Sequence, residues 1–267
     1  MLILNTFSGF GSRGRRGPPL GAMPTGLKYW MAPRYWESWN GSGTVGNAVP
    51  GAVAPYAASW NLMNMTFAGR IDGQSSADCF VGTAASSSIF HAPLSESDRL
   101  DTGWHKDNAA FTIAMTLYLN GSDTSKRILC TMNEITMPAT SGILLYKNPQ
   151  NKLYCFIGNG SGTFSLNVST DNNFVPSNAW VFLGLSINEA AGTGFFYCNG
   201  QQSTFAASYS TPSTAAPYRR LGVGDAGANG YDLGVGDRVG DILIADTAWT
   251  KAQMDQAFAT VRTVWGI

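Results

Sequence analysis

The feature that most constrains this fold is a nine-residue stretch in which apolar side chains alternate with small or polar ones. From Phe111 to Leu119 the large apolar positions recur at every second residue. This period places one face of an extended strand on a core and leaves the other face to smaller side chains. A chain built around such a segment belongs to the all-β class.

Shorter stretches of the same kind follow along the chain, separated by turn-forming dipeptides. These dipeptides include Asn148-Pro149, Asn159-Gly160 and Asn199-Gly200, whose residues favour tight turns. The 267 residues include 31 glycines and are only 13% charged, which argues against a coiled coil or a disordered solvating chain. We predict further strands at 142–146, 153–157, 163–168, 180–187, 194–198 and 241–245.

One helix is expected, close to the C-terminal end of the sequence. Thr250 is followed three residues later by Gln253, the spacing of a capping box. Apolar residues then recur at helical spacing and form one stripe, which should lie against the sheets. The stripe consists of Met254, Ala257, Phe258, Val261 and Trp265.

The balanced net charge conceals a division of the chain into two unlike parts. Residues 1–60 hold five basic side chains and one acidic one, whereas the remainder holds 12 basic and 16 acidic. The same 60 residues carry ten of the 31 glycines and six of the 12 prolines. We predict an extended arm and linker at residues 1–59 and a folded domain at residues 60–267.

The cysteines and histidines give no pattern of a metal site. Cys79, Cys130, Cys155 and Cys198 lie far apart inside apolar runs, so we expect buried thiols rather than disulfides. His91 and His105 do not lie in a ligand-spaced cluster. We predict no metal and no cofactor, although the repeat Leu221–Asp225 and Leu233–Asp237 leaves open a calcium site formed by Asp225, Asp232 and Asp237.

The sequence predicts that the chain is not an enzyme. Its four glutamates, Glu37, Glu96, Glu134 and Glu189, are far from one another, whereas retaining glycosidases need two carboxyl groups about 5–5.5 Å apart. Two aspartate pairs, Asp98 with Asp101 and Asp237 with Asp241, are interpreted as solvated loop residues. No nucleophile elbow of the type Gly-x-Ser-x-Gly is present.

Several segments, taken in order, resemble the laminin-G-like and concanavalin A-like jelly rolls. They are the strand Phe111–Leu119, the strand 180–187, the hairpin around Cys198-Asn199-Gly200, the segment 240–245 and the closing helix. The resemblance implies an all-β jelly-roll sandwich over residues 60–267, with a lectin-like role. The chain departs from the extracellular pattern because it lacks the closing disulfide, and its acidic residues do not match the calcium ligands of that pattern.

The first 60 residues resemble, in composition, the glycine-, arginine- and proline-rich arms of bacteriophage structural proteins. This second resemblance implies a non-enzymatic virion protein of the tail, baseplate, fibre or head decoration. The arm would attach it to other virion subunits, and the jelly roll would contact a host-surface glycan. Because the sequence lacks a secretory leader and any apolar stretch of bilayer-spanning length, we expect no membrane contact and assembly in the host cytoplasm.

Docking by the arm would depend on basic and aromatic anchors, which supply charge and contact area. The candidate residues are Arg13, Arg15, Arg16, Lys28, Tyr29, Trp30, Tyr35, Trp36 and Trp39. One alternative is that the aromatic run covers a face of its own sandwich. A further alternative is single-stranded nucleic acid on the arginines, but one short cluster makes a small electrostatic footprint, so we do not expect nucleic acid as a partner.

Glycan binding in a lectin-like sandwich calls for aromatic faces and amide or carboxylate groups in loops. By these criteria the candidate residues are Tyr146, Asn229, Tyr231 and Asp232. The remaining alternative is a free-standing carbohydrate-binding module with no virion role. Displayed modules are commonly symmetric multimers, so a homo-oligomer is expected.

Overall fold

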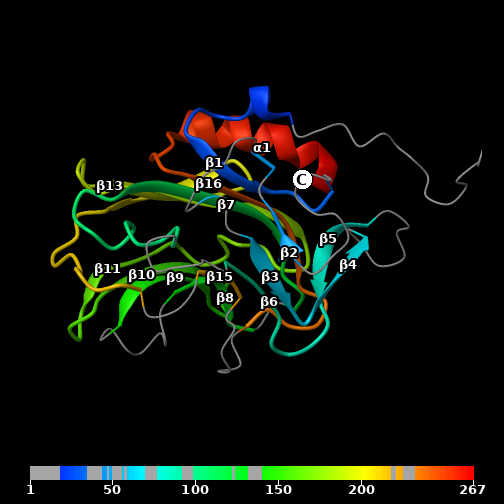
Figure 1. Cartoon of the computed structure of the whole chain (residues 1–267), viewed down its shortest axis with the longest axis horizontal. Helices are drawn as coiled ribbons and strands as arrows, with labels where there is room; N and C mark the ends of the chain where they lie inside the picture. Colours follow the sequence, from blue (N-terminus) through cyan, green and yellow to red (C-terminus); the bar gives the residue numbers. More distant parts are fainter. Residues whose placement is uncertain are drawn as a thin grey trace, which may run out of the picture.

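The computed structural model describes most of the chain as one two-layered structure. The described residues are 19–34, 44–46, 48–49, 56, 59–69, 77–91, 99–121, 124–131, 140–217, 221–224 and 232–267. Two eight-stranded sheets lie one above the other, and each strand pairing in this part of the chain is antiparallel (Figure 1). The predicted all-β sandwich is confirmed.

Sheet A is the upper layer in Figure 1 and is centred on β7, which contains most of the alternating stretch Phe111–Leu119. Its strands follow the order β14-β13-β12-β7-β16-β5-β4, and β1 also pairs with β16. Their bounds are β1 Leu27–Met31, β4 Met65–Gly69, β5 Ala77–Gly82, β7 Ala110–Tyr118, β12 Trp180–Asn188, β13 Thr193–Cys198, β14 Gln201–Ala206 and β16 Arg238–Ala245.

Sheet B is the lower layer, with the order β11-β10-β9-β8-β15-β6-β3-β2. Its strands are β2 Thr44–Val45, β3 Trp60–Met63, β6 Ser88–His91, β8 Lys126–Cys130, β9 Ser141–Lys147, β10 Leu153–Asn159, β11 Phe164–Ser169 and β15 Gly222–Val223. The six strands predicted after Leu119 all form, within a few residues of their expected ends.

Three hydrophobic clusters follow from these layers. The largest lies between the sheets and takes the inward side chains of both, among them Ile113, Leu145 and Ile157. A second cluster lies between the outer face of sheet A and the C-terminal helix. The third is small and lies on the outer face of sheet B. Sheet B therefore carries apolar side chains on both faces.

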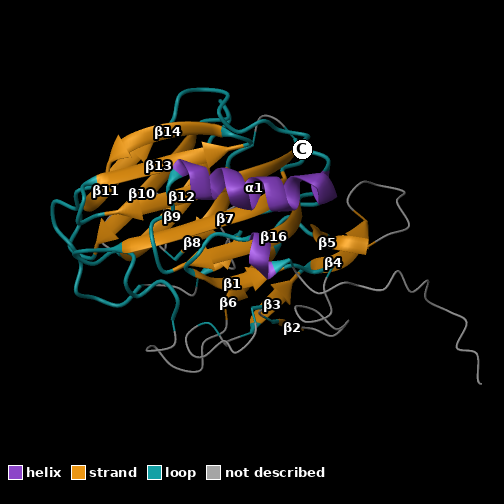
Figure 2. Ribbon diagram, turned by 90° about the horizontal axis from the view of Figure 1, so that it is seen from above, coloured by secondary structure: helices purple, strands orange, loops and turns teal. Residues whose placement is uncertain are grey.

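Helix α1, Lys251–Trp265, lies across sheet A (Figure 2). The predicted capping box is confirmed, because Thr250 and Gln253 exchange side-chain to backbone hydrogen bonds. Met254, Ala257, Val261 and Trp265 are buried. The helix approaches the sheet closely: a Cβ added at Gly240 would lie 2.4 Å from the Trp265 ring, and one at Gly184 would lie 2.7 Å from Met254 Cε.

The boundary predicted near residue 59 does not separate an arm from the sandwich. Strand β1 pairs with β16, and β2 pairs with β3, so parts of the segment 1–59 are strands of the two sheets. The physical reason is that Tyr29 and Met31 fill the core between the sheets while Trp30 fills the cluster beneath the helix. Residues 1–18 and 35–43 lie outside the described residues.

The four cysteines are buried and in the reduced form, as predicted. Burial raises the pKa of the Cys198 thiol to about 12, which makes this group unreactive at neutral pH. In the ranges that the structure describes, no helix combines the length and apolarity that a bilayer crossing needs.

Candidate functional site

The outer face of sheet B presents four aromatic side chains in neighbouring positions. Leu145, Cys155 and Ile157 point into the core, so the alternate residues of β9 and β10 point outward. Among these outward residues, Tyr146, Tyr154 and Phe156 are aromatic, and Phe164 of β11 packs beside Phe156. We call Tyr146, Tyr154, Phe156 and Phe164 the aromatic row.

The rings of the aromatic row contact one another in sequence across three strands. Tyr146 and Tyr154 are register partners with ring centroids 6.2 Å apart. Tyr154 and Phe156 lie 5.7 Å apart with an interplanar angle of 2°, and Phe156 lies 5.1 Å from Phe164. Phe156 is only 9% exposed, whereas the other three rings are half-buried. The row therefore offers partly exposed ring faces held by packing.

A rigid turn borders the row at the end of β9. Asn148 Oδ1 accepts the Lys152 N–H at 2.9 Å, and Asn148 N–H donates to the Lys152 carbonyl at 3.0 Å. Asn151 adopts a left-handed conformation, and its carbonyl accepts the Val175 N–H. The turn places Lys152 Nζ 5.5 Å from the centroid of the Tyr154 ring. Tyr146 is anchored at the same end, because its hydroxyl donates to Ser125 Oγ.

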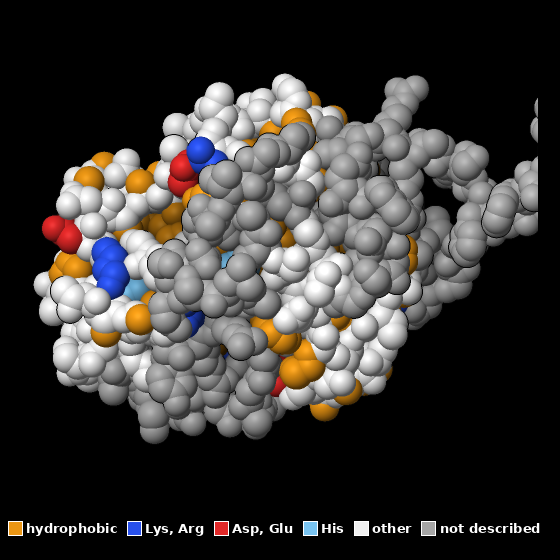
Figure 3. All heavy atoms as spheres, viewed as in Figure 1, with side chains coloured by type: hydrophobic (Ala, Val, Ile, Leu, Met, Phe, Trp, Pro, Cys, Tyr) orange, Lys and Arg blue, Asp and Glu red, His pale blue; other side chains and the backbone are white. Residues whose placement is uncertain are grey.

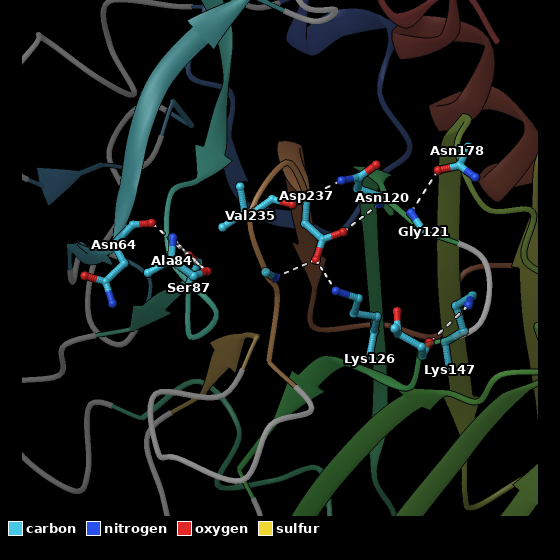
Figure 4. Close-up of polar contacts among 12 residues, drawn as sticks. Asn64, Ala84, Ser87, Asn120, Gly121, Lys126, Lys147, Asn178, Val235 and Asp237 are labelled. Atoms are coloured by element: carbon cyan, nitrogen blue, oxygen red, sulfur yellow. Dashed lines mark hydrogen bonds and ion pairs between the residues drawn. The ribbon is translucent and has the colours of Figure 1, made fainter.

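The loops at this end of the sandwich are organised by the buried carboxylate of Asp237 (Figure 4). Its Oδ2 accepts Lys126 Nζ and the Gly234 N–H, each at 2.6 Å, and its Oδ1 accepts the Asn120 N–H at 2.6 Å. The Asp237 carboxylate thus links the loop at Asn120 and the loop at Gly234 to the start of β8. The loop held in this way projects Val235, whose side chain is 63% exposed.

These contacts concern the calcium site that the sequence left open, formed by Asp225, Asp232 and Asp237. Both Asp237 oxygens accept hydrogen bonds from N–H donors of the fold. Asp232 is 3% exposed and accepts the Ser86 hydroxyl at 2.6 Å, and Asp225 lies outside the described residues. Within those residues, no group of three or more possible ligands is placed to hold a metal ion. The two repeat copies also differ: Gly222–Val223 is β15, whereas residues 234–237 form a turn.

The structure does not bring the predicted glycan-binding residues together. Tyr146 belongs to the aromatic row, but Asp232 lies beside Ser86, and strands β8 and β15 separate β9 from β6 in the sheet. Asn229 and Tyr231 lie outside the described residues. Sequence reasoning missed Tyr154, Phe156 and Phe164, although the pattern Leu153-Tyr154-Cys155-Phe156-Ile157 places two aromatic residues on the face opposite the core positions.

The predicted docking residues within the described part of the chain belong to the sandwich. Tyr29 and Trp30 are fully buried, so the interpretation that they contact another subunit is wrong and the alternative, a cover for their own sandwich, holds for them. Lys28 is 45% exposed and forms an ion pair with Asp246 at 3.3 Å. The other six, Arg13, Arg15, Arg16, Tyr35, Trp36 and Trp39, lie outside the described residues.

Trp30 is held by a second buried carboxylate, that of Asp241 on β16. Asp241 accepts Trp30 Nε1 at 2.7 Å, Trp265 Nε1 at 2.5 Å and Arg34 Nη1 at 2.8 and 2.7 Å on its two oxygens. The Arg34 guanidinium also lies 5.7 Å from the centroid of the Trp265 ring. This carboxylate joins β1, sheet A and the helix.

The aspartates interpreted as solvated loop residues are buried instead. Asp237 and Asp241 are fully buried in the two separate networks described above, and Asp101 is 1% exposed beside Arg99. Burial raises the pKa of the Asp101 carboxyl to about 6. Asp98 lies outside the described residues. These groups are buried because each has charged or N–H donors that sequence spacing does not reveal.

The two histidines occupy structural positions. His105 is buried, its Nε2 donates to the Ala215 carbonyl at 2.8 Å, and burial lowers its pKa. The same carbonyl accepts Lys106 Nζ at 2.9 Å. His91 packs edge-on against Trp60, with ring centroids 5.6 Å apart. Glu189 accepts the N–H groups of Asn108 and Tyr209.

The surface shows few charges. On the face seen in Figure 3, few charged side chains of the described residues appear, one acidic and one basic group lie side by side near the upper left, and small hydrophobic patches lie between polar atoms. This agrees with the low charged fraction of the sequence. A ligand on such a surface would be recognised chiefly by ring faces and hydrogen bonds, with single charges adding selectivity.

Comparison with known proteins identifies the fold but no family. No family model and no curated protein sequence matches this chain. Among solved structures it is similar to a Trypanosoma rangeli sialidase in complex with sialic acid, with 12% identity and a TM-score of 0.55 over 89% of this chain and 33% of that one. It is also similar to the binding domain of botulinum neurotoxin DC in complex with SialylT, with 10% identity and a TM-score of 0.60 over 89% and 52% of the two chains.

A third structure, the botulinum neurotoxin serotype D binding domain, has 10% identity and a TM-score of 0.61 over 88% of this chain and 50% of its own. The chain thus spans a third to about half the length of these proteins. At these identities the likeness shows a β-sandwich fold. The resemblances to laminin-G domains and to phage arms stay predictions.

Proposed function

We propose that this chain is a lectin-like carbohydrate-binding module that binds its glycan on the aromatic row. The observation that carries the proposal is the outward-facing set of rings on sheet B, of which Tyr146, Tyr154 and Phe164 are half-buried. The apolar face of a sugar ring stacks on such a surface, and nearby amide and hydroxyl groups bind its hydroxyls. The turn at residues 148–152 supplies such groups at one end of the row.

A binding surface formed before the ligand arrives loses little entropy on binding. The rings lie on β9, β10 and β11, which are paired along their whole lengths, apart from one irregularity near Gly158. The structural neighbours support the glycan class, because one of them is a complex with sialic acid and another is a complex with SialylT.

The test is a glycan array with the full chain, followed by titration of the best ligand against Tyr154→Ala. We expect an affinity about fivefold to tenfold lower, the loss typical of a contact tyrosine. Tyr118→Ala is the matched control, since Tyr118 is a half-buried tyrosine on the outer face of sheet A beside Trp180. Far-UV circular dichroism verifies that both variants fold. Equal binding by Tyr154→Ala and the full chain would overturn the proposal.

We propose that the module binds its glycan without cleaving it. The described carboxylates Asp101, Asp237 and Asp241 are buried and bonded within the fold, and Glu189 accepts two backbone N–H groups. The measurement is the release of free sialic acid from 3′-sialyllactose during prolonged incubation with the protein. Catalytic release above that of a heat-inactivated sample would contradict a binding role.

The attachment of this module to a virion, with assembly in the host cytoplasm, is a further proposal that depends on the composition of the first 60 residues. Because Lys28, Tyr29 and Trp30 belong to the sandwich, the candidate docking residues that remain are Arg13, Arg15, Arg16, Tyr35, Trp36 and Trp39. The test is co-sedimentation with phage particles after substitution of the three arginines by alanine. Removal of residues 1–40 is unsuitable, because it deletes β1. Undiminished co-sedimentation of the triple variant would contradict arginine docking, and light scattering would test the proposed homo-oligomer.

A further inference from the structure

Lys152 lies at the border of the aromatic row, where its charge can act on a bound ligand. Its Nζ is 5.5 Å from the centroid of the Tyr154 ring. The backbone on both sides of Lys152 is fixed by the hydrogen bonds to Asn148 and by the Leu153 N–H, which donates to Thr170 Oγ1 at 3.0 Å. A ligand that stacks on Tyr154 therefore lies within reach of this ammonium group.

The strands of the surrounding half of sheet B contain basic residues and no acidic ones. The strands β8 to β11 and the turn at residues 148–152 contain Lys126, Arg127, Lys147 and Lys152 and no acidic residue. Lys126 is neutralised by Asp237 at 2.6 Å. Asp171, which follows β11 closely in sequence, forms no ion pair with Lys152 among the described contacts. Arg127 and Lys147 are buried as well, so Lys152 is the one of these four residues that lies half-buried at the surface, where its charge favours an anionic ligand.

We propose that the glycan bound on the aromatic row carries a carboxylate, as sialic and uronic acids do, and that Lys152 binds this carboxylate while Tyr154 stacks on the sugar ring. An ammonium–carboxylate hydrogen bond is stronger than the neutral contacts of a sugar hydroxyl. The aromatic row supplies affinity for sugar rings in general, and Lys152 supplies selectivity for acidic ones. This inference rests on the function proposed above.

The experiment compares ligands that differ in the carboxylate alone. The full chain is titrated with 3′-sialyllactose, with its methyl ester and with lactose; tetragalacturonate and its methyl ester form the uronic-acid arm. We expect at least one acid to bind about tenfold more tightly than its ester, with a preference that weakens as salt rises. The arm that shows the preference identifies the source of the carboxylate.

Variants of Lys152 separate charge from shape. Lys152→Gln should bind acid and ester equally, and Lys152→Arg should retain most of the preference for the acid. Lys28→Gln, which removes a half-exposed lysine from sheet A, is the matched control and should bind as the full chain does.

The outcomes distinguish failure of the carboxylate inference from failure of the proposed glycan binding. If a neutral sugar or ester binds as well as its acid, or if Lys152→Gln keeps the preference, the carboxylate inference is overturned while glycan binding stands. If none of these glycans and none on the array binds, the proposed function is overturned together with the inference.

Discussion

Substitution of the buried Asp241 should lower the free energy of unfolding more than substitution at most other positions of the fold. Asp241 is fully buried, and its partner Arg34 has a side chain only 9% exposed. Asp241→Asn removes the charge and replaces one of the two acceptor oxygens by an NH2 donor, so the Arg34 guanidinium loses its counter-ion and at least one of the bound N–H groups loses its acceptor. Breaking one partner of a buried ion pair typically costs about 3–5 kcal/mol, a large part of the roughly 5–15 kcal/mol of a native protein.

The assay is chemical denaturation followed by tryptophan fluorescence, with a thermal scan as a second probe. For a chain of this size a loss of about 3–5 kcal/mol lowers the melting temperature by roughly 6–20 °C. Asp246→Asn is the matched control, because it removes an exposed ion pair near the end of β16, for which we expect at most about 1 kcal/mol. If Asp241→Asn lowers the unfolding free energy no more than this control does, the carboxylate is not a structural junction and the reasoning fails.

Two other predictions concern packing and pH. Gly240→Ala should lower the unfolding free energy by about 1–3 kcal/mol, since a Cβ there meets the Trp265 ring at 2.4 Å. The control is Gly103→Ala, where a Cβ would have no atom within 4 Å and the unfolding free energy should change by less than about 0.5 kcal/mol. Equal effects of the two variants would contradict this account. The raised pKa of Asp101, about 6, means that the folded chain holds its proton more firmly than the unfolded chain, so this group lowers stability as pH rises from about 4 to 6. Asp101→Asn should therefore become more stable relative to the wild type between pH 4.5 and pH 7.5 by about 2 kcal/mol, measured by denaturation at both values, whereas a difference independent of pH would refute the assignment.

The strands and the helix were accessible to sequence reasoning because their signals are local. The alternation from Phe111 to Leu119 became β7, and the Thr250 capping box became the start of α1. Strand β1 was missed because both of its faces are buried, so it shows an apolar run rather than an alternation. Its glycine- and proline-rich flanks then favoured the interpretation of the whole segment as an arm.

The buried carboxylates were beyond local patterns for a different reason. Trp30 and Asp241 are 211 positions apart in the sequence, and Lys126 and Asp237 are 111 apart. An aspartate in a turn-rich segment is most often solvated, and only the pairing of distant strands shows that these have donors. The candidate site was predicted only in part. Tyr146 was identified from its residue type, whereas its neighbours Tyr154 and Phe164 lie beside it because of the register of β9, β10 and β11, which the sequence does not show.

The pairing of β1 with β16 sets an order of events during synthesis. At roughly 5–20 residues per second, the ribosome adds Asp241 about 10–40 s after Trp30, given their separation of 211 residues. Throughout that interval Tyr29, Trp30 and Met31 form an apolar segment whose partner strand does not yet exist. The nascent chain therefore presents this segment to chaperones and to other nascent chains, and sheet A is completed only after β16 has been made.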